Sequence, residues 1–151
     1  MSDTLKQWNR VNRALTKIEN NQNRNLDDYE DDIWSFFQNC WHLKDWVKND
    51  DVINEIYRTS VENDVHEIES IKMCADLANR SKHLKLTFSR VDANVSSRDL
   101  HIHAAPPGQG GYGEYNFKIT NSEGAVFDAI EVAKDSVKKW SELLTAYKVI
   151  K

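Results

Sequence analysis

Residues that cross-link, interrupt or loosen a chain are scarce in this sequence. It contains two cysteines, two prolines and five glycines among 151 residues. A domain of this length buries roughly two-thirds of its unfolded surface, so its stability requires neither a disulfide nor a structural metal. We expect Cys40 and Cys74, each on a helical pattern, to be buried free thiols. The sequence predicts a domain stabilised by its apolar core.

Excess positive charge, a long apolar run and a signal peptide are also missing. The formal net charge is −4, which argues against broad, non-specific nucleic-acid binding but leaves room for a small basic site. No apolar run approaches the ~18 residues of a membrane span. Residues 1–6 lack the apolar region of a signal peptide. We therefore expect no membrane partner and a cytoplasmic location.

Apolar residues recur at three- and four-residue steps over most of the chain, which is typical of amphipathic helices. The pattern predicts helices at about 4–22, 27–49, 52–59, 64–82 and 124–149. The five tryptophans are expected in the core, and three of them lie on the helix at 27–49, which is therefore expected to be central. They are Trp8, Trp34, Trp41, Trp46 and Trp140.

The period changes to strict alternation between about 84 and 120, which is strand spacing. Alternating apolar positions occur at 84–88, 100–104 and 115–119, whereas 91–99 is polar and loop-like. Four of the five glycines fall in 108–113, where we expect a hairpin loop. The predicted fold is mainly α: a four- to five-helix bundle, 1–151, with a small antiparallel β insertion at about 84–120 before the last helix.

The most informative polar cluster ends the helix predicted at 64–82. Its members are spaced mainly three or four residues apart, so most of them share one side of the helix end. They are Asp76, Asn79, Arg80 and His83, and Lys82 adds positive charge. A guanidinium stabilises charge on a phosphoryl group, and an imidazole can move a proton. The alternative is an ordinary polar helix C-terminus, where the helix dipole favours basic residues.

A second polar pair lies on the predicted central helix. His42 and Asp45 are one turn apart, so the carboxylate could orient the imidazole, although most such pairs are structural. If this helix packs beside the one at 64–82, His42 and Asp45 would converge with Asp76 and His83. Together with Lys82, we treat His42, Asp45 and Asp76 as candidate binding residues.

Two further features of the β insertion leave alternatives open. His101 and His103 alternate on one predicted strand, a spacing that metal sites use, but Asp99 is the one evident third ligand nearby. The Gly-rich stretch at 108–113 lacks the Lys-Ser/Thr of a phosphate-binding loop and precedes a strand. We expect no metal and no other cofactor, with a metal enzyme kept as a minor alternative.

Two segments carry a family resemblance. Residues 36–46 and 76–83 resemble small uncharacterised bacterial helical proteins and, more distantly, the HEPN superfamily of helical-bundle domains. The resemblance implies a commonly dimeric bundle, and many members are metal-independent ribonucleases of defence or toxin–antitoxin systems. The family motif places a histidine four to six residues beyond an arginine, whereas His83 follows Arg80 after two intervening residues.

The resemblance implies roles for the residues at this helix end. His83 would be the general acid or base, Arg80 or Lys82 the phosphate clamp, and Asn79 an orienting group. The leading hypothesis is thus a protein that binds or cleaves RNA or nucleotides. The alternative is a non-catalytic interaction module that binds another protein or, through its helices, a second copy of itself.

The nuclease hypothesis makes a direct prediction about His83. Overexpression of a ribonuclease should slow growth, and His83→Ala should relieve that effect because the acid/base group is gone. Growth curves and RNA integrity on gels measure both. Equal harmlessness of the two forms, with no RNA cleavage by either, contradicts the catalytic hypothesis.

Overall fold

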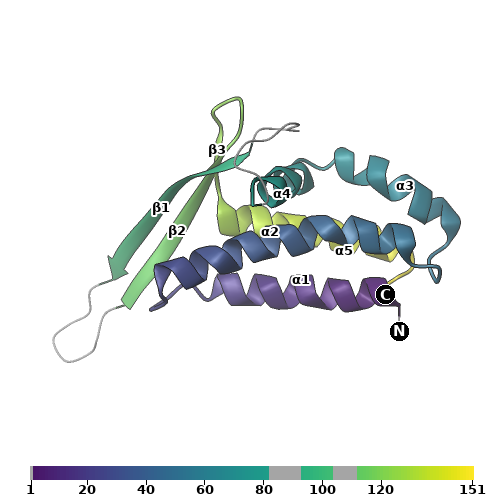
Figure 1. The fold of residues 1–151 in the computed structure, drawn as a ribbon, viewed down its shortest axis with the longest axis horizontal. Helices are drawn as coiled ribbons and strands as arrows, with labels where there is room; N and C mark the ends of the chain where they lie inside the picture. Colours follow the sequence, from purple (N-terminus) through teal and green to yellow (C-terminus); the bar gives the residue numbers. More distant parts are fainter. Residues whose placement is uncertain (1, 82–92, 104–111) are drawn as a thin grey trace.

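A computed structural model describes residues 2–81, 93–103 and 112–151 (Figure 1). It confirms the predicted class: five helices and a small three-stranded antiparallel sheet that precedes the last helix. In chain order the elements are α1 (Asp3–Glu19), α2 (Leu26–Asn49), α3 (Glu55–His66), α4 (Glu69–Arg80), β1 (Asn94–His103), β2 (Tyr112–Thr120), β3 (Val126–Asp128) and α5 (Ala129–Ala146).

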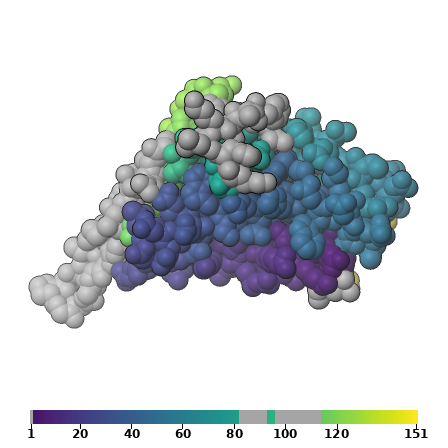
Figure 2. Space-filling model, in the orientation of Figure 1, coloured from purple at the N-terminus to yellow at the C-terminus, as the bar shows by residue number. Residues whose placement is uncertain are grey.

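Helix α2 is central, as its apolar stripe predicts. It contacts α1, α3, α4 and α5, and α1 runs antiparallel beside it (Figure 1). On the face drawn in Figure 2, side chains of α1 and α2 lie directly against each other and α3 covers one end of the body. Among the described residues, no helix is both long and apolar enough to cross a bilayer.

The core lies between α2, α4 and α5. Trp140 and both Phe36 and Phe37 are completely buried, and the two phenylalanine rings meet edge to face with centroids 5.3 Å apart. Trp8 and Trp41 are also buried, whereas the other two tryptophans are partly exposed. The prediction that the tryptophans lie in the core is therefore confirmed for three of the five.

The prediction for the middle helices is wrong in its boundary. A single helix, α3, continues through Asp64 to His66, and α4 begins at Glu69 after a two-residue break. Asp64 does not cap a helix; its carboxylate accepts hydrogen bonds from Ser60 Oγ at 3.0 Å and from the Tyr147 hydroxyl. Because α3 starts three residues later than the helix predicted at 52–59, Val52 lies in the preceding turn and is 80% exposed.

The sheet has the order β1-β2-β3, with both neighbouring pairs antiparallel. Residues 94–99 belong to β1, so the loop expected at 91–99 is wrong for most of its length. Cross-strand pairing with β2, from Asn94 opposite Thr120 to His103 opposite Tyr112, overrides the polar composition. The strand expected at 84–88 and most of the Gly-rich loop lie outside the described residues.

The last helix begins later than its sequence pattern predicts. Residues 126–128 form β3, and Asp128 caps α5 by accepting hydrogen bonds from the N–H groups of Ile130 and Glu131. Val126, an apolar residue inside the helix predicted at 124–149, is 62% exposed. This arrangement ties the start of α5 to the sheet, and it creates a corner that holds a pocket of about 470 Å³.

The cysteine prediction is confirmed. Cys40 and Cys74 are free and buried. The Cys74 thiol lies 3.2 Å from the Ser136 hydroxyl, which itself donates to the Val132 carbonyl. Burial beside Cys74 raises the pKa of the Cys40 thiol well above its usual range, so both sulfurs act as core atoms.

Candidate functional site

Two side chains at the end of α4 form hydrogen bonds with the backbone of Ala93, the first described residue before β1. Asp76 is completely buried, and its Oδ2 accepts a hydrogen bond of 3.2 Å from the Ala93 N–H. One turn further on, Arg80 Nε donates to the Ala93 carbonyl at 2.8 Å. Ala93 is itself completely buried. Two charged side chains thus satisfy both backbone groups of one residue and hold the start of β1 on the bundle.

The other residues predicted at this helix end are placed differently. Asn79 is partly exposed, and its neighbour Ser81 accepts a hydrogen bond of 2.6 Å from Gln38 on α2. His83 and Lys82, the predicted acid/base group and clamp, lie outside the described residues. The structure therefore brings Asp76 and Arg80 together around Ala93, and it leaves the proposed catalytic constellation a prediction.

The predicted pair on α2 is not joined. Within the described part of the chain, no hydrogen bond links His42 to Asp45; instead Asp45 Oδ1 accepts one of 2.7 Å from Lys44. His42 is exposed whereas Asp76 is completely buried. The lysine continues toward α3, where its Nζ lies 3.5 Å from Glu62. This part of α2 is an ion-paired surface next to α3.

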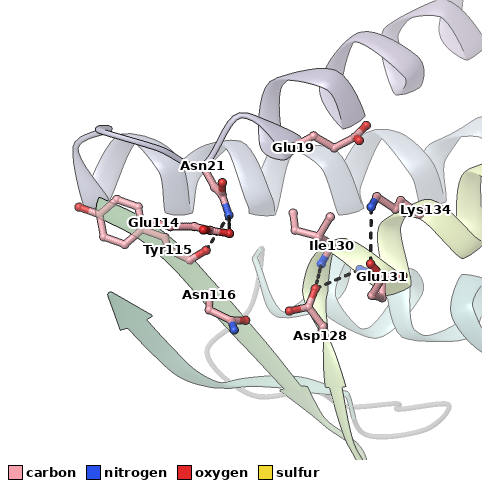
Figure 3. Close-up of a pocket in the computed structure, with 9 residues that line it drawn as sticks. All are labelled: Glu19, Asn21, Glu114, Tyr115, Asn116, Asp128, Ile130, Glu131 and Lys134. Carbon is pink, nitrogen blue, oxygen red and sulfur yellow. Dashed lines mark hydrogen bonds and ion pairs between the residues drawn. The ribbon is translucent and has the colours of Figure 1, made fainter. Parts of the chain in front are cut away.

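A more open site lies where the α1–α2 turn, β2 and α5 meet (Figure 3). It is a cavity of about 470 Å³. In Figure 3 the turn and β2 form one side, and the first turns of α5 form the other. The lining residues are Glu19, Asn21, Glu114, Tyr115, Asn116, Asp128, Ile130, Glu131 and Lys134. We call this cavity the acidic pocket.

Asn21 joins the α1–α2 turn to β2 at the pocket wall. Its side-chain amide donates to Glu114 Oε1 at 3.2 Å and to the Tyr115 backbone carbonyl at 3.0 Å. The backbone carbonyl of Asn21 accepts from the Tyr115 N–H. Next in the turn, Asn23 adopts φ of 52°, a left-handed conformation that asparagine tolerates. The asparagine-rich stretch at 20–25 thus follows the end of α1 at Glu19 and also fixes the wall of the pocket.

An aromatic stack supports the floor beneath this wall. The Tyr29 ring of α2 stacks on Tyr115 with centroids 5.7 Å apart, and it tilts against Phe117 at 5.4 Å. The Tyr29 hydroxyl donates to the Ile18 carbonyl at 2.7 Å. Burial raises the pKa of Tyr29 well above its ordinary value, so this phenol stays protonated. Its role is structural, because it links α2 to the end of α1.

The pocket is strongly negative. Four carboxylates line it against one lysine. Lys134 lies 3.5 Å from Glu131, and Asp128 is engaged in capping α5. Glu19 makes no ion pair within the described ranges of the chain, and it ends α1, whose C-terminal carbonyls add partial negative charge. Partial positive charge at the start of α5 opposes this field, but Asp128 offsets it.

One buried polar atom points to a ligand that donates hydrogen bonds. Asn116 Oδ1 is buried and has no hydrogen-bond partner in the part of the chain that the structure describes. The amide can rotate, but with its oxygen placed this way the wall presents acceptors. A phosphate would meet repulsion here, whereas a protonated amine or a guanidinium would find complementary charge.

Metal chemistry finds no support in the described ranges. No group of three or more His, Cys, Asp or Glu side chains there is arranged to hold a metal ion. The backbone of β1 places His101 and His103 opposite Glu114 and Tyr112 in register. The metal alternative for these histidines stays a prediction.

Sequence patterns alone miss this pocket. Its residues come from three separated segments, 19–21, 114–116 and 128–134, so no single spacing or motif joins them. The available signals are the asparagines that end α1 and the aspartate at 128, which is a helix N-cap type of residue. Neither signal indicates a pocket until the register of β2 is known.

Comparison with known protein families, with curated proteins and with solved structures finds no match for this chain. The HEPN resemblance therefore stays a prediction that rests on residues 36–46 and 76–83. Function must be argued from the site itself.

The hydrogen bonds from the end of α4 to Ala93 are expected to stabilise the folded protein. Asp76→Asn should lower the free energy of unfolding by about 1–3 kcal/mol, because it removes the charge from a buried hydrogen bond. Arg80→Ala should cost about 1 kcal/mol, since its contact is partly exposed. Asn79→Ala, the neighbouring control, should stay within about 0.5 kcal/mol.

Urea unfolding followed by circular dichroism measures all three variants. A stability loss in Asn79→Ala equal to that in Asp76→Asn would contradict the anchoring role. So would an Asp76→Asn protein as stable as the parent.

Proposed function

We propose that the protein is a non-catalytic interaction module whose acidic pocket receives a cationic side chain, lysine or arginine, from a protein partner. The observation that carries this proposal is the excess of carboxylates around an open cavity of about 470 Å³. A cavity of this size admits the end of a long basic side chain with part of its backbone. The pocket walls would supply charge, and the neighbouring sheet and helix would supply contact area.

Electrostatic complementarity favours this occupant over the others. Each carboxylate that approaches an ammonium or a guanidinium forms a charge-assisted hydrogen bond, which is stronger than a neutral one. Glu19 offers such an acceptor without first having to break an ion pair to a described residue. Asn116, whose buried side-chain oxygen has no described hydrogen-bond partner, lies in the same pocket wall. An anionic ligand such as RNA would be repelled by the same groups.

The ribonuclease hypothesis has less support from the described residues. Asp76 is inaccessible, and Arg80 and Asp76 both bind the Ala93 backbone, so their arrangement has a structural explanation. Cleavage through His83 remains testable by the growth comparison described for His83→Ala. A positive result there would make the helix end, and not the acidic pocket, the functional centre.

Binding of a charged peptide tests the proposal. In a ¹H–¹⁵N NMR titration, the blocked peptide acetyl-Gly-Lys-Gly-amide should shift amide resonances of Asn21, Glu114 and Glu131, because these residues line the pocket. The matched acetyl-Gly-Glu-Gly-amide should not. Glu19→Gln should weaken binding of the lysine peptide about 2- to 5-fold, the worth of one exposed charge pair.

Glu123→Gln is the matched control, because Glu123 is exposed in the β2–β3 turn and does not line the pocket. It should leave the affinity unchanged. Equal binding of both peptides, or equal effects of the two substitutions, would overturn the proposal.

A further inference from the structure

The outer edge of the sheet is the second surface with an identifiable partner. β1 is ten residues long and pairs with β2 on one side; no described residue pairs with its other side. Figure 1 shows β1 on the side of the sheet away from α1 and α2. The far edge of β2, by contrast, is occupied by β3 and by a bridge from Gln22 to Glu114.

An edge of this length, with no strand partner among the described residues, is a template for another strand. We propose that two copies of this chain associate by antiparallel pairing of their β1 strands, centred on Leu100. Such a contact is closed and self-complementary, since one two-fold axis relates both halves. It joins two three-stranded sheets into one six-stranded sheet, and it leaves the acidic pocket of each copy as a separate site.

Geometry restricts the possible registers. The two-fold axis of an antiparallel pair is perpendicular to the sheet, so each face is preserved. Residues directly opposite each other share a face, and faces alternate with every residue. The two residue numbers of an opposed pair must therefore both be odd or both be even. A register is then defined by the one residue that lies opposite its own copy.

Charge selects among these registers. Centring on Arg98 or on Asp99 places two like charges opposite each other, and centring on His101 opposes two imidazoles. Centring on Leu100 opposes two leucines and places Asp99 opposite His101 of the second copy, twice. Opposite charges at directly opposed positions stabilise a strand pair, whereas like charges destabilise it.

The irregularity in β1 agrees with the same centre. Its register against β2 shifts between Val95 and Ser97, and from Ser97 to His103 it is regular. A pairing centred on Leu100 uses this regular segment from end to end, with Ser97 opposite His103. The shifted part near Val95 stays outside the contact, beside α4.

The strand register places acidic residues next to position 101. Glu114 lies opposite His101 on β2, and Asp99 and His103 lie two positions away on β1. In the dimer, His101 would lie between Glu114 of its own copy and Asp99 of the second copy. The row of opposed residues across the six strands therefore has an acidic residue on each side of position 101.

Cysteine cross-linking tests the register. Leu100→Cys places two thiols at directly opposed positions, about 4.5–5.5 Å apart between Cβ atoms, which a disulfide reaches after a small shift. Mild oxidation should therefore give a covalent dimer. The control His103→Cys places its thiols about 20 Å apart in this register and should not cross-link. Cys40 and Cys74 are buried in both.

Sedimentation velocity tests the association itself. At about pH 6, where an unperturbed imidazole is mostly protonated, the parent protein should show a reversible monomer–dimer equilibrium. Asp99→Lys should weaken it about tenfold, because two favourable pairs become repulsive. Asp31→Lys, an equal charge change at an exposed position of α2, should not.

Circular dichroism confirms that each variant is folded. A parent protein that stays monomeric at about 1 mM would overturn the proposal. Equal cross-linking of the two cysteine variants, or equal weakening by the two lysine variants, would overturn it as well. Neither outcome bears on the acidic pocket, whose test uses Glu19→Gln.

Discussion

The junction of α4 with Ala93 is the constraint on which the rest of the structure depends. The buried Asp76 carboxylate accepts from the Ala93 N–H, and Arg80 donates to the Ala93 carbonyl. A buried charge is stable only when it is hydrogen-bonded, and here the bonds go to the backbone of a residue next to β1. This contact holds the start of the sheet against the helices.

From that anchor, the strand register positions the acidic pocket. β1 aligns β2, which places Glu114 and Asn116 opposite His101 and Asp99. β2 then aligns β3, and β3 ends in Asp128, the cap of α5. Asn21 closes the corner by binding β2 from the α1–α2 turn. The pocket is thus a consequence of topology, which explains why residues from three separated segments meet there.

The sequence predicts the elements whose partners are helices better than those whose partners are strands. The three-and-four spacing of α2 and α5 reports one buried face, and the cores of both helices are where the pattern puts them. The prediction is wrong for Val52 and Val126, because these apolar residues lie in a turn and at the start of a strand instead of in a helix. Residues 94–99 fail because pairing with β2 decides their conformation, and spacing within β1 does not report a distant partner.

The candidate site shows the same division. Spacing correctly places Asp76 and Arg80 near each other at one helix end, but it cannot distinguish a carboxylate that faces solvent from one that binds a buried backbone. Glu19, Glu114 and the pair Asp128 and Glu131 lie far apart in sequence, so no local pattern links the three. Asp76 therefore has a described structural partner, whereas Glu19 at the pocket is the more accessible carboxylate.

Hydrogen exchange at the Ala93 amide tests the anchor most directly. Because this N–H is buried and donates to Asp76, it should exchange as slowly as the amides of the α4 core, such as Leu77. Exchange at the rate of an unstructured peptide would contradict the account, since the start of β1 would then not be held by α4.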